Sequence, residues 1–418
     1  MVPNQISKLD LIQARIDVIP SDWKLCKVAE ALNIRNNLRK PISQEVRETI
    51  KGDYPYYGPT RVQGYISEYE QDGTYALIGE DGDHFLKYAT MPQTQYISGK
   101  CTVNNHAHIL ESSEICDAQW FFNYFKHRDI TNFLSRQGAG RFKLNKATLE
   151  KLPMLVPPLP EQCKIAKILS TWDKAIATTE KLIEASKQQK KSLMQQLLTG
   201  KKRLVNPETG KAFEGEWERH SMSDLVFIDR KSLGKKTPDD FEFQYISLSD
   251  VAVGSISNEL EVHKFASAPS RARRVIQEGD ILLSTVRPNL KGFAKVSGKH
   301  ADCIASTGFS VLTPKKRVSG DYIYQYIFSS HVTGQIDSLV VGSNYPAINS
   351  SDVAGLKVYC PTYEEQQKIA SALTTADKEI EVLEAKLADF KQEKKALMQQ
   401  LLTGKRRVKI EHMEQAIC

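Results

Sequence analysis

Residues 161–201, EQCKIAKILSTWDKAIATTEKLIEASKQQKKSLMQQLLTGK, return at residues 365–405 as EQQKIASALTTADKEIEVLEAKLADFKQEKKALMQQLLTGK. The copies lie 204 residues apart and align without a gap, and about 25 of the 45 positions from Pro160 to Leu204 match their counterparts. A period of this length is too long for a solenoid. It indicates a duplicated two-part module with pseudo-two-fold symmetry, in the order variable, constant, variable, constant.

Both constant segments are predicted to be long helices with a heptad seam. In the second copy the apolar residues follow one another at alternating steps of four and three, which is the coiled-coil spacing. A helix of roughly 40 residues is about 60 Å long and is not stable with its apolar stripe in water. The predicted partner is the other copy, in an antiparallel coiled coil. The seam residues are Ile165, Leu169, Trp172, Ile176, Ile183, Leu193 and Leu197 in the first copy, and Ile369, Leu373, Ile380, Leu383, Leu387, Phe390, Leu397 and Leu401 in the second.

The two copies differ along this seam. Trp172, Thr179 and Ser186 stand where the second copy has Ala376, Leu383 and Phe390. Complementary packing predicts that large residues face small ones.

The variable segments are predicted to be two α+β globular domains. Strand-like runs occur at 95–103 and 106–111 in the first segment, and at 243–251, 279–288 and 309–314 in the second. Helical stretches follow at 117–135 and 321–336. The predicted boundaries are 1–159 for the first domain, 160–203 for its helix, 204–363 for the second domain, 364–407 for its helix and 408–418 for a tail.

Charge and motifs point away from catalysis. The net charge is +7, but most of the excess lies in residues 160–203, which carry 10 basic and 4 acidic groups. The sequence has no phosphate-binding loop, no methyltransferase motif and no nucleophile elbow, and the His106–His108 pair has no third metal ligand. We therefore expect no catalytic residue, no metal site and no cofactor in this chain. Because it has neither a signal pattern nor a long apolar run, a cytoplasmic location is expected.

Several clusters combine basic, amide, hydroxyl and aromatic side chains, the groups that contact phosphates and base edges. Arg287 precedes a proline, which predicts an extended backbone that projects its guanidinium from a loop. Taken singly, each cluster is also compatible with ordinary solvated surface. The candidate nucleic-acid contacts are Tyr56, Tyr57, Arg61, Gln63, Lys100, Arg136, Gln137, Arg141 and Lys143 in the first domain, and Arg271, Arg273, Arg274, Ser284, Thr285, Arg287, Asn289, Lys291, Ser343, Asn344 and Tyr345 in the second.

The whole pattern resembles the specificity subunits of Type I restriction–modification systems. The resemblance rests on EQxKIA at 161–166 and 365–370, LMQQLLTGK at 193–201 and 397–405, the PYYG turn at 55–58 and GDILLSTVRPNLKG at 279–292. It implies two target-recognition domains, each of which reads one half of a bipartite site in double-stranded DNA. It also implies that the coiled coil sets the gap between the half-sites.

The same resemblance implies partner proteins that carry the chemistry. Two methyltransferase subunits would bring S-adenosylmethionine, and two restriction subunits would bring ATP hydrolysis, which needs Mg²⁺, and cleavage. Two other functions are weighed against this one. A fused restriction–methylation enzyme would need a catalytic motif, and none is present. A coiled-coil adaptor that binds only proteins would show little salt dependence, whereas phosphate contacts weaken steeply with salt.

Overall fold

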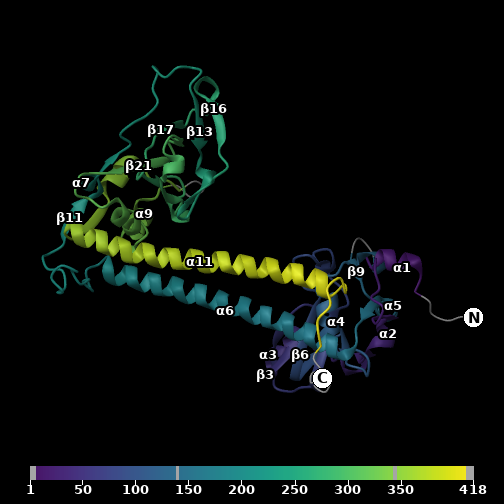
Figure 1. Cartoon of the computed structure of the whole chain (residues 1–418). Coiled ribbons are helices and arrows are strands. Elements are labelled where there is room, and N and C mark those ends of the chain that lie inside the picture. The colour runs from purple at the N-terminus through teal and green to yellow at the C-terminus, as the bar shows by residue number, and fades with distance from the viewer. Residues whose placement is uncertain (1–5, 138–140, 342–345, 411–418) are drawn as a thin grey trace, which may run out of the picture. The chain divides into compact units, whose positions relative to one another are not determined.

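The computed structural model describes residues 6–137, 141–341 and 346–410, and the chain divides into two compact units. The first unit comprises residues 1–179 and 386–418, and the second comprises residues 180–385. Two long helices, α6 (Leu159–Leu197) and α11 (Tyr363–Leu401), each pass from one unit into the other (Figure 1). Each unit therefore contains one variable domain together with part of both helices.

A six-stranded sheet lies at the centre of the first unit, in the order β2-β7-β5-β6-β3-β4. Its strand pairs are antiparallel except for β3 with β6, which run parallel. Helix α4 (Ala118–Phe125) packs against β5 and β6. The strands of this unit are β1 (Lys24–Lys27), β2 (Asn33–Ile34), β3 (Lys51–Tyr57), β4 (Val62–Ile66), β5 (Gln71–Gly79), β6 (Thr94–Val103), β7 (Ala107–Glu111), β8 (Ser135–Gln137), β9 (Arg141–Lys143) and β10 (Pro153–Val156), and its other helices are α1 (Lys8–Gln13), α2 (Val28–Ala31), α3 (Gln44–Thr49) and α5 (Lys146–Lys151).

The second unit contains two four-stranded sheets, in the orders β12-β21-β18-β19 and β16-β13-β20-β17. Helix α8 (Gly320–Ile327) packs against β21 of the first of these sheets. The strands are β11 (Glu218–Ser221), β12 (Val226–Ile228), β13 (Glu242–Ile246), β14 (Val251–Ala252), β15 (Ser255–Ile256), β16 (Glu261–Lys264), β17 (Ala272–Val275), β18 (Ile281–Ser284), β19 (Phe293–Lys295), β20 (Ile304–Ser306), β21 (Phe309–Pro314) and β22 (Lys357–Cys360), and the other helices are α7 (Met222–Leu225), α9 (Ser330–Leu339) and α10 (Ser350–Gly355).

Four of the predicted elements differ from the expectation. The strand predicted at 279–288 ends at Ser284. The helix predicted at 321–336 is divided between α8, which ends at Ile327, and α9, which begins at Ser330.

The other two elements end early. The strand predicted at 243–251 ends at Ile246, where Ser247 and Asp250 bond to each other and begin a 3-10 turn. The helix predicted at 117–135 ends at Phe125, whose carbonyl accepts from the side chain of Gln93 at 3.3 Å. In the strand, the local bond between Ser247 and Asp250 competes with the regular ladder.

One glutamine near the start of each long helix, Gln162 in α6 and Gln366 in α11, forms hydrogen bonds that link the helix to its own domain. The amide of Gln162 accepts from the backbone N–H of Asp117, next to α4, and donates to the carbonyl of Pro157. Gln366 repeats both contacts in the second unit, with Ser319 and Pro361. The polar identity between the repeats therefore has a structural role beyond the apolar seam.

The two helices run antiparallel in each unit. In the first unit Lys394 of α11 forms an ion pair with Asp173 of α6. In the second unit Lys190 of α6 pairs with Asp377 of α11 at 2.5 Å. These four residues are the same two positions of the repeat, 204 residues apart, with the roles of the helices exchanged. In the described part of the chain, no helix is both long and apolar enough to cross a membrane.

The residues of the seam are buried or half-buried, but the expected matching of large with small is wrong. The rings of Trp172 and Phe390 meet edge to face, with centroids 5.6 Å apart. The equivalent positions of the repeat in the second unit are Ser186 and Ala376. The antiparallel register thus brings the two large residues together in one unit and assigns the two small ones to the other.

Candidate nucleic-acid interface

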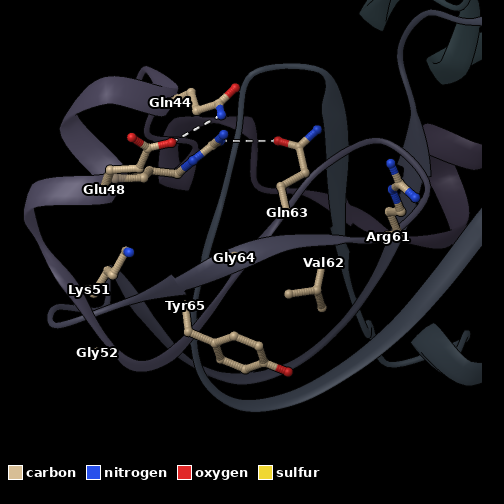
Figure 2. A pocket seen from close by; sticks show the side chains of 10 residues that line it. Gln44, Glu48, Lys51, Gly52, Arg61, Val62, Gln63, Gly64 and Tyr65 are labelled. Carbon is tan, nitrogen blue, oxygen red and sulfur yellow. Dashed lines mark hydrogen bonds between the residues drawn. The ribbon is translucent and has the colours of Figure 1, made fainter.

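The first unit has a polar groove between helix α3 and the hairpin of β3 and β4. The groove has a volume of about 780 Å³, and its side chains include Gln44, Arg47, Glu48 and Arg61 (Figure 2). A second hollow, of about 430 Å³, shares two residues with the first, Arg47 and Gln63, and adds Asn104, Asn105 and His106. The concave surface around these shared residues is called the α3 groove below.

Arg47 is held on both sides where the two hollows meet. Its guanidinium lies over the ring of Tyr56, 4.8 Å from the centroid, and its Nη1 donates to Oε1 of Gln63 at 3.3 Å. The same oxygen accepts from Nδ2 of Asn104 at 3.2 Å. The Nε atom of Arg47 is buried and has no hydrogen-bond partner. The guanidinium is therefore oriented by the protein, and only its terminal nitrogens can serve a ligand in the groove.

One of the two tyrosines predicted as contacts in this region is structural instead. Tyr56 is 1% exposed, and its hydroxyl donates to the carbonyl of Lys40 and accepts from the N–H of Ile42. It therefore supports Arg47 from beneath and does not reach a ligand. Tyr57 is half-buried, and burial raises the pKa of its hydroxyl.

Three other predicted residues of the first domain are exposed. Arg61 and Gln63 lie on the groove, at the turn of the hairpin and on β4. Lys100 lies on β6 and does not line the groove. Its ammonium sits 4.8 Å from the ring centroid of Tyr69, which is also the main cause of its raised pKa. The groove thus gathers Arg61 and Gln63 but not Lys100.

The structure describes only part of the predicted basic loop at 136–143. The backbones of Arg136, Gln137 and Arg141 belong to strands β8 and β9, and residues 138–140 lie outside the described residues. Lys143 forms an ion pair with Glu80 at 3.3 Å, and Arg39 pairs with the same carboxylate. The charge of Lys143 is therefore balanced by a carboxylate of the protein itself.

The arginine cluster of the second unit separates into one exposed residue and two supporting ones. Arg274 forms an ion pair with Asp229 at 2.8 Å. Arg273 donates to the carbonyl of Ala272 and lies over the ring of Phe265. Arg271 is exposed and remains the suitable contact of the three.

The 287–291 loop, from Arg287 to Lys291, is built on buried hydroxyls. Ser284 donates to the carbonyl of Val286 at 2.7 Å, and Thr285 donates to that of Gly308 at 2.9 Å. Both side chains are buried, so these two predicted contacts shape the loop and do not face solvent. Arg287 and Asn289 are exposed, and Lys291 is half-exposed.

The expectation of an extended backbone at Arg287 is wrong. Its φ and ψ are 49° and 51°, and those of Lys291 are 53° and 38°, so left-handed residues flank the short 3-10 turn Pro288–Leu290. The backbone N–H of Arg287 donates to the carbonyl of Pro346 at 2.7 Å, a tertiary contact that a prediction from the following proline cannot include. Left-handed backbone outside glycine is strained, and such strain is often found at functional loops. The predicted contacts Ser343, Asn344 and Tyr345 lie outside the described residues.

The local sequence does not mark Arg47 or Asn104 as nucleic-acid contacts, because neither belongs to a basic cluster. It marks His106 only as one half of the His106–His108 pair. Arg47, Asn104 and His106 come together because β3, β4 and the turn after β6 converge beside α3. The other histidine of the pair, His108, is buried, with its ring nitrogens bonded to Leu144 and Asn36.

Comparison with known proteins identifies the family. The family model of the Type I restriction modification DNA specificity domain matches residues 20–188 and again residues 214–392. The chain belongs to this family. Each matched range covers one variable domain and most of the long helix that follows it.

Relatives of the specificity-domain family match the chain over all or part of its length. The Type I restriction enzyme MjaVIII specificity subunit of Methanocaldococcus jannaschii is 26% identical and covers 94% of each chain. A putative type I restriction enzyme specificity subunit of Haemophilus influenzae is 36% identical over 35% of this chain and 36% of its own length. The crystal structure of the S subunit of a Type-I restriction-modification system from M. genitalium has the same fold, with a TM-score of 0.61, 12% identity and coverage of 92% and 97%.

Membership of this family also settles the class of the protein. It is a Type I specificity subunit with two DNA specificity domains, and such subunits are recognition proteins that are not themselves catalytic. The mixed helix and sheet architecture with long helices between the domains agrees with the predicted fold class.

Proposed function

We propose that this specificity subunit reads a bipartite site in double-stranded DNA, one half-site with each domain. The observation that carries the proposal is the presence of two copies of the DNA specificity domain in one chain, each with its own polar surface. The α3 groove serves the first half-site, and the 287–291 loop with Arg271 serves the second. Because the two surfaces differ in shape and composition, the half-sites they read differ in sequence.

The second part of the proposal is a scaffold function. The chain assembles in the cytoplasm with two methyltransferase subunits and two restriction subunits, which bind S-adenosylmethionine, ATP and Mg²⁺. The duplicated long helices support this part, since each unit repeats the same helix contacts and so offers an equivalent surface. The chain itself then contributes recognition, and the partners contribute methyl transfer and cleavage.

Modified-base sequencing tests the proposal directly. The chain is expressed with its cognate methyltransferase subunit in cells that lack other adenine methylation. The expected result is a methyladenine motif with two defined half-sites and a constant gap, which disappears when this chain is omitted. A motif that persists without the chain would overturn the proposal, and so would a stable complex that yields no motif and binds DNA with no salt dependence.

A further inference from the structure

We propose that Arg47, positioned by Gln63, reads the guanine of a G·C base pair in the first half-site. This inference rests on the proposed function and assigns a base-reading role to one side chain. It concerns a residue that belongs to no basic cluster in the sequence. Three features of the α3 groove carry it: the way Arg47 is oriented, the donors it has left, and the charge of its neighbours.

The orientation of Arg47 is set before any ligand binds. The ring of Tyr56 lies under the guanidinium, and the hydroxyl of that tyrosine is itself anchored to the backbone at Lys40 and Ile42. An arginine stacked on an aromatic ring loses little rotational freedom on binding, so its donors keep their direction. A surface arginine that served only as a charge would gain nothing from this support.

The donors that remain are suited to guanine. Gln63 takes one N–H of Nη1 of Arg47, and the Nε atom is buried and out of reach of a ligand. The donors that remain for a base are those of the two terminal nitrogens, Nη1 and Nη2. The planar fork of an arginine donates two parallel bonds to O6 and N7 of guanine, which is the commonest specific contact in the major groove. Gln63 is in turn held by Asn104 through the same oxygen, so the pair Arg47–Gln63 forms one oriented unit.

The groove carries charges of both signs. Lys51 and Arg61 line it together with Arg47 and suit the phosphates of a DNA backbone, whereas the one carboxylate among its described residues is that of Glu48. Glu48 accepts from Gln44 at 3.1 Å (Figure 2). A carboxylate repels a phosphate group, whereas it accepts readily from the N4 amino group of cytosine. A groove that combines Arg47 and Glu48 therefore matches the edge of a G·C pair, which offers both acceptors and a donor.

A substitution at Gly58 tests the contact between Arg47 and Gln63 without removing either side chain. A Cβ atom at this position would lie 2.4 Å from Nε2 of Gln63, so a larger residue displaces that side chain. Gly58→Ala should therefore loosen Arg47 through Gln63 while leaving the guanidinium in place. Its expected effect on base preference is smaller than that of removing Arg47.

The experiment measures base preference at each position of the bipartite site. The full chain with its methyltransferase subunit is presented with a DNA library in which every position of the methylated motif is varied. The variants are Arg47→Met, Arg47→Lys and Gly58→Ala, with Lys151→Met as the matched control at an exposed lysine outside the groove. Unfolding midpoints and the salt dependence of binding are recorded for each protein.

The expected result is local. Arg47→Met and Arg47→Lys lose roughly 10- to 100-fold discrimination at one G·C position of the first half-site, and the second half-site is unchanged. The lysine variant keeps its charge, so its salt dependence should match that of the unmodified chain. An equal loss on all sequences with a shallower salt dependence would make Arg47 a phosphate contact. Unchanged preference with a lower unfolding midpoint would make it structural. Failure of the proposed function is distinguishable, because the unmodified chain would then show no motif.

Discussion

Arg203, just beyond the end of α6, forms a two-pronged ion pair with Glu365 in the first turn of α11. The Nε–Oε1 and Nη2–Oε2 distances are both 2.7 Å, and the glutamate side chain is fully buried. The first unit repeats the joint with Arg407 and Glu161, at 2.8 and 2.7 Å. Each helix therefore ends beside the beginning of the other copy, and the same two positions of the repeat form both joints.

Removing Arg203 should destabilise the second unit strongly. Arg203→Ala leaves the carboxylate of Glu365 buried without its cation, which costs about 3–5 kcal/mol of unfolding free energy. Arg203→Lys should recover only part of this loss, because an ammonium cannot form the bidentate pair. Urea unfolding measures both. The double variant Arg203→Ala with Glu365→Gln is the control and should be more stable than Arg203→Ala alone. A loss below about 1 kcal/mol, as for an exposed pair, would show that the joint is not needed.

The first unit should lose stability in mild acid because of His108. Burial lowers the pKa of this histidine below its usual value of 6.5, and the bonds to Leu144 and Asn36 suit a neutral ring. The unfolded state therefore binds the proton more readily than the folded state. Stability is fully present above pH 6.5 and falls as the pH drops from there toward the folded pKa, by up to about 1.4 kcal/mol per pH unit.

Unfolding midpoints between pH 7.5 and pH 5 measure this dependence. His108→Gln keeps one donor and one acceptor but does not titrate, so its stability should change less over the same range. An equal slope for the variant and the unmodified chain would assign the acid sensitivity to other groups. Lys151→Met serves as the surface control.

Two substitutions at Lys291 can distinguish the effect of its charge on DNA binding from the effect of its left-handed backbone on stability. Lys291→Gly removes a cation but relieves the left-handed backbone, so the free energy of unfolding should rise by about 1 kcal/mol. Binding to DNA should weaken and its salt dependence should decrease by about one phosphate contact. Lys291→Ala is the matched control, since it removes the same charge and keeps the strain. Destabilisation by the glycine variant would show that the lysine side chain holds the loop.

The long helices should set the gap between the half-sites. Four residues inserted in each helix, after Thr179 and after Leu383, add about 6 Å and rotate the following residues by about 40°. One base pair adds 3.4 Å and turns the DNA by about 34°. The expected methylation motif keeps both half-sites and gains one or two base pairs in the gap. Two inserted residues per helix rotate the chain by about 200° and should abolish the motif. A motif with an unchanged gap after the longer insertion would exclude this role for the helices.

The residue-level site was less predictable than the architecture. Ser284, Thr285 and Arg274 have the right chemistry for DNA contacts, but their polar atoms are bonded within the protein. Arg47 lies in an unremarkable stretch and becomes a candidate only because the hairpin of β3 and β4 brings Gln63 to it. The folded backbone decides which partners these polar groups meet and so which of them remain for a ligand, whether the partner is two residues away, as Val286 is from Ser284, or many more.

The duplication, the two long helices and the class of fold could all be predicted from the sequence. These follow from an offset of 204 residues and from heptad spacing, which are properties of the linear chain. Which residues of the seam meet, as Trp172 does with Phe390, depends on the tertiary structure, because the antiparallel register pairs different positions of the two repeats. The tertiary structure also decided the backbone of Arg287, where a contact with Pro346 overrides the local preference before a proline. Periodicity can be recognised in a short stretch of sequence, whereas burial and register depend on contacts between segments that are separated in the chain.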